Sequence, residues 1–229
     1  MNFLELKSGT SVEGQEIKAF KAEEKGAKCI YLIAGVHGDE VEGVFVLKQL
    51  FSWLQETDDH TIPLLVIPTL NIDGHRCGAR VNAHGVDLNR NLPSDNWSND
   101  FKEQKYNPGN KPLSEPENQF LVNLFDKYPP LFIISFHTWK PLLNYNGDCI
   151  DIANFLSRHN NYSVEGDVGY ETPGSLGEYA PKKYNSPVLT YELPKIDTGL
   201  SLNDIWLQNH FGLKKLFGAK IFKDLFENK

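Results

Sequence analysis

A histidine and a glutamate follow an apolar run near the start of the chain. The segment YLIAGVHGDEVEG places His37 just beyond residues that could form a buried strand, and Glu40 three residues later, where a helix is expected to begin. At this spacing an imidazole nitrogen and a carboxylate oxygen can turn toward one point, and zinc accepts both kinds of ligand. The pair alone is ambiguous, because a similar pair, His84 and Asp87, occurs in HGVD and because acids in the first turn of a helix often only complement its dipole.

A second histidine, His137, ends another apolar run, LFIISFH. Open α/β sheets place ligand sites beyond the carboxyl ends of their strands, so His37 and His137 would meet if their strands were parallel neighbours. Together with Glu40 they would leave one position of a tetrahedral ion open, which is typical of catalytic rather than structural zinc. We therefore expect one catalytic zinc per chain, with water as the fourth ligand.

A glutamate, Glu192, interrupts a third apolar run, LTYEL. Beside a metal, this carboxylate would be the general base for a zinc-bound water. On the edge strand of a sheet, it would instead be a charge that faces water. The choice between the two interpretations depends on where the fold puts this strand.

Strands and helices are expected to alternate along the chain. Apolar runs predict buried strands at 29–34, 64–70, 131–137 and 188–193. Helical spacing predicts helices at 41–54, 114–128, 149–159 and 201–229. Ser114 is expected to cap the second of these helices. This order predicts an α/β fold, with an open, twisted, mixed and largely parallel sheet that carries helices on both faces, in a single domain over 1–229.

Composition argues against several classes of protein. The 229 residues carry a net charge of −7, which does not suit an extended nucleic-acid or anionic-membrane surface. No apolar run approaches the ~18 residues that a membrane span needs. The three cysteines are far apart, so neither a disulfide framework nor a thiolate zinc site is indicated. The N-terminal segment lacks the pattern of a secretory signal, and we therefore expect a cytoplasmic protein.

Arginine is rare and clustered. Three of the four arginines, Arg76, Arg80 and Arg90, fall within fifteen positions. A guanidinium group can grip a carboxylate in a planar, bidentate way, so the cluster suits a carboxylate-binding site. Three arginines on one loop can equally be solvated and have no common role.

Several motifs in order resemble the zinc carboxypeptidases of the M14 type. The resemblance covers nearly the whole chain through H-x-x-E, NIDG, GVDLNRN, SEPE, SFH and TYEL. Within that family the chain is most similar to the bacterial murein peptide amidases, which carry nearly the same GVDLNRN, SEPE, SFH and VGYETPGS segments. The resemblance implies a zinc-dependent carboxypeptidase or amidase of that fold.

The resemblance also implies roles for individual residues. His37, Glu40 and His137 match the zinc ligands of the family, and Asp87 matches the acid that orients the first ligand histidine. Glu192 matches the catalytic glutamate.

The arginine cluster gains roles in the same way. Arg80 matches the arginine that polarises the scissile carbonyl and stabilises its oxyanion. Asn89 and Arg90 match the pair that binds the free carboxylate of the terminal residue. Tyr170 stands twenty-two residues before Glu192, the spacing of the family's substrate-binding tyrosine.

The resemblance implies a small peptide with a free terminal carboxylate as substrate, and in particular the γ-D-glutamyl–meso-diaminopimelate bond of murein peptides in cell-wall recycling. Glu178, near the expected pocket for the leaving residue, could meet a distal ammonium of that residue or could be a solvated acid. Two alternatives remain open: a zinc amidohydrolase of the succinylglutamate desuccinylase or aspartoacylase kind that acts on N-acyl amino acids, and a non-catalytic zinc- or peptide-binding module. We expect no nucleic-acid or membrane partner, and a monomer or homodimer.

Overall fold

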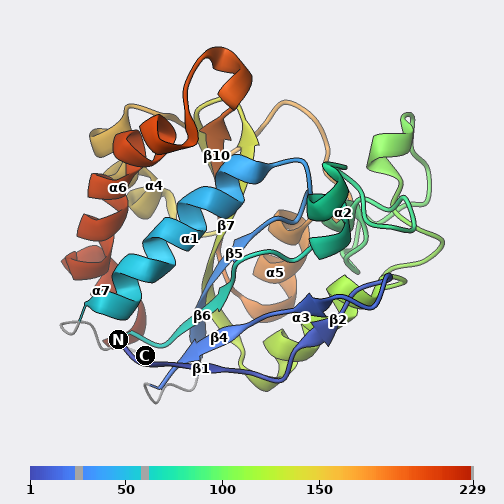
Figure 1. The fold of residues 1–229 in the computed structure, drawn as a ribbon, viewed down its shortest axis with the longest axis horizontal. Coiled ribbons are helices and arrows are strands. Elements are labelled where there is room, and N and C mark those ends of the chain that lie inside the picture. The colour runs from blue at the N-terminus through green and yellow to red at the C-terminus, as the bar shows by residue number, and fades with distance from the viewer. Residues whose placement is uncertain (24–27, 58–61, 228–229) are drawn as a thin grey trace.

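The computed structural model describes residues 1–23, 28–57 and 62–227 of the chain. Its main element is an eight-stranded sheet with helices on both faces (Figure 1). In spatial order the strands are β1 (Phe3–Glu5), β4 (Phe20–Ala22), β6 (Leu64–Ile67), β5 (Cys29–Ala34), β7 (Pro130–Trp139), β10 (Val188–Pro194), β8 (Leu142–Asn146) and β9 (Ser163–Glu165). A separate small sheet pairs β2 (Gly9–Thr10) with β3 (Glu16–Ile17).

The four central strands, β6, β5, β7 and β10, run parallel to one another. Antiparallel pairs flank this centre, since β4 pairs antiparallel with β6 and β8 pairs antiparallel with β10. The predicted mixed, largely parallel sheet is therefore confirmed. Because parallel strands end at the same edge of a sheet, the carboxyl ends of β5, β7 and β10 lie together.

Helices cover the two faces of the sheet and form two apolar cores. They are α1 (Val41–Glu56), α2 (Ile72–Cys77), α3 (Pro116–Lys127), α4 (Ile150–Asn160), α5 (Leu176–Tyr184), α6 (Leu202–Gly218) and α7 (Lys220–Glu227). One core joins the sheet to α1, α4, α6 and α7, and the other joins it to α3 and α5 (Figure 1). Strand β5 serves both: Ile30 and Leu32 face the first core, whereas Tyr31 and Ile33 face the second. Burial on both faces explains why this strand is apolar at every position. None of the helices in the described part of the chain combines the length and apolar character that a membrane span requires.

The prediction that Ser114 caps a helix is wrong by one residue. Glu115 is the N-cap of α3, in an extended conformation, and Pro116 is the first helical residue. Proline suits the first position of a helix and pushes the residue before it out of the helical region, so the helix starts at the proline. The Ser114 hydroxyl instead donates a hydrogen bond to Glu115 Oε1 (2.6 Å).

The C-terminal segment forms two helices where one was predicted. Helix α6 ends at Gly218, Ala219 is extended (φ −75°, ψ 140°), and α7 follows. The break allows Phe222, which is fully buried, to pack against Phe217 and Phe132, with ring centroids 5.2 and 6.3 Å apart. The predicted helix extended to residue 229, but 228–229 lie outside the described residues.

Two strands and a helix lie in the stretch between residues 138 and 187 without having been predicted. Strand β8 reads LLNYN, and asparagine is disfavoured in strands, so propensity alone does not identify it. Its antiparallel pairing with β10 holds it in the sheet. Helix α5 begins at Leu176, where the side chain of Ser175 accepts a hydrogen bond from the Glu178 amide as the N-cap.

The loop after β5 passes very close to α2, and only a glycine fits there. A Cβ at Gly38 would lie 2.1 Å from the carbonyl carbon of Gly74 and 2.4 Å from the amide nitrogen of His75. Both are backbone atoms that cannot rotate away. We expect Gly38→Ala to lower the free energy of unfolding by about 1–3 kcal/mol or more, as measured by urea denaturation, because it overpacks this contact.

Gly218→Ala is the matched control, since a Cβ at the end of α6 would meet nothing within 4 Å. An unchanged unfolding midpoint for Gly38→Ala would contradict the close approach of the two segments.

Candidate active site

The sheet register brings the chemically active residues of three strands to one edge. Strands β5 and β7 are parallel neighbours with Ala34 opposite Phe136, so the loop that carries His37 starts beside His137. Strand β10 lies on the other side of β7, with Glu192 directly opposite His137. Because β10 also pairs with β8, it is an interior strand, and the interpretation of Glu192 as an edge-strand charge is wrong.

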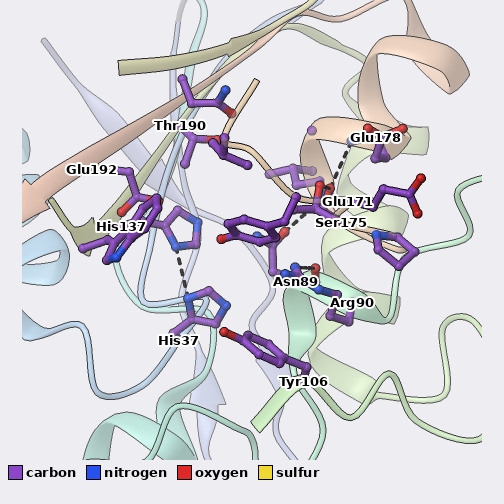
Figure 2. A pocket seen from close by; sticks show the side chains of 18 of the residues that line it. His37, Asn89, Arg90, Tyr106, His137, Glu171, Ser175, Glu178, Thr190 and Glu192 are labelled. Atoms are coloured by element: carbon purple, nitrogen blue, oxygen red, sulfur yellow. Dashed lines mark hydrogen bonds between the residues drawn. The ribbon is translucent and has the colours of Figure 1, made fainter. Parts of the chain in front are cut away.

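The three predicted metal ligands lie together and are buried. His37 Nδ1 is 2.7 Å from Glu40 Oε1 and 3.2 Å from His137 Nδ1, the contact drawn between the two rings in Figure 2. His137 Nδ1 is 2.9 Å from the other oxygen of Glu40. In the described part of the chain, this is the only group of three or more His, Cys, Asp or Glu side chains that could hold a metal ion. His60 lies outside that part, and among the residues that the structure describes His75, His84, His159 and His210 belong to no such group.

Each ligand histidine is held through its other ring nitrogen. His37 Nε2 donates a hydrogen bond to Asp87 Oδ1 (3.1 Å), as the predicted orienting role of Asp87 requires. His137 Nε2 lies 3.0 Å from the hydroxyl of Ser135. Hydrogen bonds of this kind set the tautomer and ring orientation of a metal-binding histidine. Ser135 was not predicted, although it stands two residues before His137 on the same strand and therefore on the same face of the sheet.

The donor set fits a zinc ion. The Nδ1 atoms of the two imidazole rings face each other at 3.2 Å, and both face the carboxylate of Glu40. Three lone pairs are thus directed toward one point, where a bound cation would accept them. Burial opposes the protonation of His37, but Glu40 and Asp87 outweigh it and raise the pKa of His37 to about 9. Burial likewise opposes the ionisation of Glu40, yet His37 and His137 hold the pKa of Glu40 well below its usual range. The carboxylate is thus ionised at neutral pH, as a metal ligand must be.

Glu192 is a carboxylate with an unused oxygen. Its Oε2 is buried and has no hydrogen-bond partner among the described residues. Burial is the main cause that raises the pKa of Glu192, to about 7, and the nearby carboxylate of Glu40 adds to the effect. A carboxyl group with a pKa near neutrality can both accept and return a proton at neutral pH.

Arg80 connects the ligand group to Asp87. Its Nη2 donates to Asp87 Oδ2 (2.9 Å), and its Nη1 lies 3.6 Å from Glu40 Oε1. Burial alone would raise the pKa of Asp87, but His37 and Arg80 hold it well below its usual range. The guanidinium also lies over the ring of Tyr106, 5.4 Å from the centroid. Tyr106 ends a short 3₁₀ helix (Gln104–Tyr106) in a segment without apolar periodicity, and no sequence pattern singled it out.

Arg90 is a buried cation that lies over the ring of Tyr106, 5.5 Å from its centroid, and whose charge helps to lower the pKa of Asp87. It is 7% exposed, and its Nη1 donates to the backbone carbonyl of Asn89 (2.7 Å). No carboxylate among the described residues lies within ion-pairing distance of it. Asn89 accepts a hydrogen bond from the Leu176 amide through Oδ1 (2.9 Å), which leaves its side-chain NH₂ group as a donor. Arg76, in contrast, is exposed and lies 3.8 Å from Glu13, so the solvated interpretation of the arginine cluster holds for this member.

These residues line one large cleft of about 1630 Å³. Figure 2 shows His137 and Glu192 on one side of it and Asn89 and Arg90 on another. Tyr170 also lines the cleft and is 52% exposed, with its ring 6.3 Å from that of Trp139.

Two residues considered in the sequence analysis, Glu178 and His84, contact charged side chains of the protein itself. Glu178 lines the cleft, but its carboxylate pairs with Lys182 at 3.2 Å. His84, in the second His-x-x-acid pair, contacts Glu115 at 2.8 Å and is not part of the ligand group.

Comparison with known proteins identifies the family of this chain. The profile of the Peptidase M14 family, described as zinc carboxypeptidase, matches residues 2–164, which is more than half of the chain. The chain belongs to the zinc carboxypeptidase family. This zinc carboxypeptidase is also 33% identical to murein peptide amidase A of Vibrio campbellii over 207 residues, which cover 85% of this chain and 81% of that protein. It is 33% identical to murein peptide amidase A of Escherichia coli over 83% of this chain and 81% of that protein.

Solved structures share the fold of this zinc carboxypeptidase. The crystal structure of murein-tripeptide amidase from Escherichia coli matches with a TM-score of 0.76 and 27% identity, over 93% of this chain and 91% of that one. Carboxypeptidase A from Helicoverpa armigera matches with a TM-score of 0.78 and 16% identity, over 94% of this chain and 68% of that one. The family and its murein peptide amidase relatives make this chain a zinc-dependent peptidase or amidase, as predicted.

The hydrogen bond from His137 to Ser135 can be tested through metal affinity. Removing the hydroxyl leaves the ring free to turn, so we expect Ser135→Ala to weaken zinc binding by about 10- to 100-fold. Competition with a chromogenic chelator measures the affinity. Ser52→Ala, on the exposed face of α1, is the control. An affinity equal to that of the wild type would mean that Ser135 does not orient His137.

The raised pKa of Glu192 can be tested through stability without metal. Below the pKa of the unfolded chain, both states are protonated and the group costs nothing. As the pH rises toward about 7, the unfolded state ionises first, so Glu192 progressively destabilises the fold. We therefore expect zinc-free Glu192→Gln to exceed the zinc-free wild type in free energy of unfolding by on the order of 1–3 kcal/mol at pH 8, and by much less at pH 5. Denaturant titrations at the two pH values measure this, and a gain independent of pH would refute it.

Proposed function

We propose that this zinc carboxypeptidase hydrolyses the terminal amide bond of small peptides, and that its substrate is the γ-D-glutamyl–meso-diaminopimelate bond of murein peptides in cell-wall recycling. One observation carries the proposal: a single cleft contains both a group suited to zinc and the buried guanidinium of Arg90, which forms no ion pair with a carboxylate among the described residues. A buried cation without a partner is costly, and a carboxylate of the substrate would compensate it. The murein peptide amidases among its relatives support the substrate class. We further propose one zinc per chain and one catalytic unit over residues 1–229.

The groups around the metal have separate tasks in the proposed reaction. When bound, zinc supplies a Lewis acid that polarises the scissile carbonyl and lowers the pKa of water toward ~7. His37 and His137 would hold it through Nδ1, since Asp87 and Ser135 engage their other ring nitrogens. Glu40 would supply the carboxylate ligand.

Glu192 and Arg80 act on the reacting atoms. Glu192 takes a proton from the attacking water and gives it to the leaving amine, a double role that its near-neutral pKa suits. Arg80, whose guanidinium lies 3.6 Å from Glu40, stabilises the negative charge that develops on the carbonyl oxygen. Since Asp87 holds this guanidinium by a 2.9 Å hydrogen bond, the charge is in position before the reaction begins.

Arg90, Asn89 and Tyr170 bind the substrate. The guanidinium of Arg90 and the side-chain NH₂ of Asn89 hold the terminal carboxylate and limit cleavage to the last bond. Tyr170, half exposed at the cleft, covers the bound peptide.

The proposal can be tested by incubating the zinc-loaded protein with L-Ala-γ-D-Glu-meso-diaminopimelate and following the release of free diaminopimelate. Glu192→Gln is the control, and we expect it to retain zinc while losing about 10²–10⁴ in rate. N-succinylglutamate is the competing substrate. Faster hydrolysis of the succinylated compound would establish the N-acyl amino acid amidohydrolase instead, and zinc binding without hydrolysis of either would establish a binding module.

The carboxylate anchor has its own test. We expect amidation of the terminal carboxylate to lower kcat/KM by at least about 30-fold, because losing one partner of a buried charge pair costs about 2–5 kcal/mol. Arg90→Ala should depress cleavage of the free acid far more than cleavage of the amide, so the gap between them should narrow. Arg76→Ala, which removes an exposed arginine of the same cluster, is the control. Equal kcat/KM for acid and amide in the wild type would rule out Arg90 as the anchor.

A further inference from the structure

One face of β10 carries a hydroxyl group into the apolar core. Leu189, Tyr191 and Leu193 alternate along the strand and face the core that α1, α4, α6 and α7 share with the sheet. Glu192 points the other way and lines the cleft. Tyr191 is 1% exposed, and its ring stacks on that of Phe136 in the neighbouring strand β7, with ring centroids 5.4 Å apart. A phenolic hydroxyl buried this deeply requires hydrogen-bond partners.

Two asparagines of the helices behind this face supply those partners. The Tyr191 hydroxyl donates to Asn209 Oδ1 of α6 (2.7 Å) and accepts from Asn160 Nδ2 at the end of α4 (2.8 Å). Asn209 Nδ2 donates to the hydroxyl of Tyr162 (2.9 Å) and to the backbone carbonyl of Ile205 (2.8 Å). Asn160 Nδ2 also donates to Asn209 Oδ1 (3.1 Å). We call Tyr191, Asn209, Asn160 and Tyr162 the tyrosine anchor.

The tyrosine anchor has little freedom to rearrange. Within these contacts the side chain of Asn209 uses both of its amide hydrogens and both lone pairs of its oxygen, which is its full capacity. Asn160 Oδ1 accepts a hydrogen bond from the Tyr162 amide (3.0 Å), so this side chain is held as well. A buried network whose members are all paired is costly to break, because a donor or acceptor that loses its partner there has no water to replace it. Helices α4 and α6 carry the network on the face of the sheet that α1 also covers (Figure 1).

The apolar residues of β10 do not by their alternation alone fix how far the strand extends along β7. The leucines on either side of Tyr191 repeat at every second residue, so a slip of two residues would again turn apolar side chains toward the core. Such a slip would move Glu192 by about 6.6 Å along the strand. Thr190 or Pro194 would then lie opposite His137 in its place. The hydroxyl of Tyr191 removes this ambiguity, since a single buried polar group can specify a register that apolar packing leaves open.

We propose that the tyrosine anchor is a positioning device: by holding Tyr191, it sets the register of β10 and thereby places the carboxylate of Glu192 beside the metal ligands. The inference rests on the proposed function, in which Glu192 is the base, and adds residues that touch neither substrate nor metal. Because Tyr191 and Glu192 are consecutive and point to opposite faces, the anchor holds the strand without entering the cleft. A network that only stabilised the core would affect stability and leave the rate of the folded enzyme unchanged.

The test begins with Tyr191→Phe, which removes the hydroxyl and keeps the ring. We expect it to lower kcat for the murein tripeptide by about 10- to 100-fold, as a small displacement of a catalytic group does, with KM and zinc affinity unchanged. Tyr162→Phe is the matched control. It removes a hydroxyl from the same network but from a residue outside β10, leaves the bond between Tyr191 and Asn209 in place, and should leave kcat unchanged.

A double-mutant cycle shows whether Tyr191 acts through the base. If it does, Tyr191→Phe should cost nothing further in the Glu192→Gln background, since the group that the anchor places is already gone. A further loss of kcat in that background, as large as the loss in the wild type, would overturn the positioning role.

Amide hydrogen exchange provides a readout that needs no substrate. Relative to the amides of β5, those of β10 should exchange about 10-fold faster in Tyr191→Phe, the effect of one lost hydrogen bond, and at an unchanged ratio in Tyr162→Phe. Asn209→Ala removes the acceptor from the helix side and should give the same results, so it serves if Tyr191→Phe does not fold. An unchanged kcat or an unchanged exchange ratio would overturn the tyrosine anchor and leave the proposed function standing. Absence of hydrolysis by the wild type would overturn the proposed function, and the exchange ratio alone would then decide on the anchor.

Discussion

The site depends on the parallel pairing of β7 with two neighbours. Strand β5 on one side and β10 on the other end at the same edge as β7, so that His137 has His37 to one side and Glu192 to the other. A shift of β10 by one residue would turn Glu192 into the opposite core, because side chains alternate between the faces of a strand. The apolar residues that fill the two cores therefore also determine which carboxylate reaches the metal. The same strand register therefore determines both how the cores pack and where the site residues lie.

At two places in the cleft, charged or polar groups lack a partner of opposite charge, and each place indicates a ligand. Around the ligand group, Glu40 and Asp87 are held ionised by the histidines and by Arg80, while two imidazole nitrogens face each other. A divalent cation would complete this end. At the other end, Arg90 has no acidic partner among the described residues and needs an anion. In the proposed function, a peptide that ends in a free carboxylate would fill the space between the two.

The sequence predicted those features of the structure that depend on the local hydrophobic pattern and on the chemistry of individual residues. Apolar runs located β5, β7 and β10, and the histidines at the ends of the first two indicated the metal group. The interior position of β10 could not be predicted from local pattern, because it depends on β8, the strand that pairs with it on one side. Strand β8 contains two asparagines and is recognisable only from this pairing. Ser114 was misplaced by one residue because proline sets where α3 begins. Tyr106 belongs to the site through contacts with residues distant in sequence. Ser135 belongs to it through His137, whose role must be known first. Roles for Arg80, Asn89 and Tyr170 came from resemblance alone.

The role proposed for the buried guanidinium of Arg90 has a consequence for the rate of the proposed reaction. In the proposed reaction, the carboxylate that Arg90 would hold is the same group in the substrate, in the transition state and in the released amino acid. An interaction of constant strength along the reaction contributes affinity and register but cannot lower the barrier from the bound state. It would also favour retention of the product, so the free amino acid would compete with new substrate for this buried cation. In the proposed reaction, the chain's own contribution to the acceleration would therefore come from Glu192 and Arg80, which would face the atoms whose charge changes as the bond breaks.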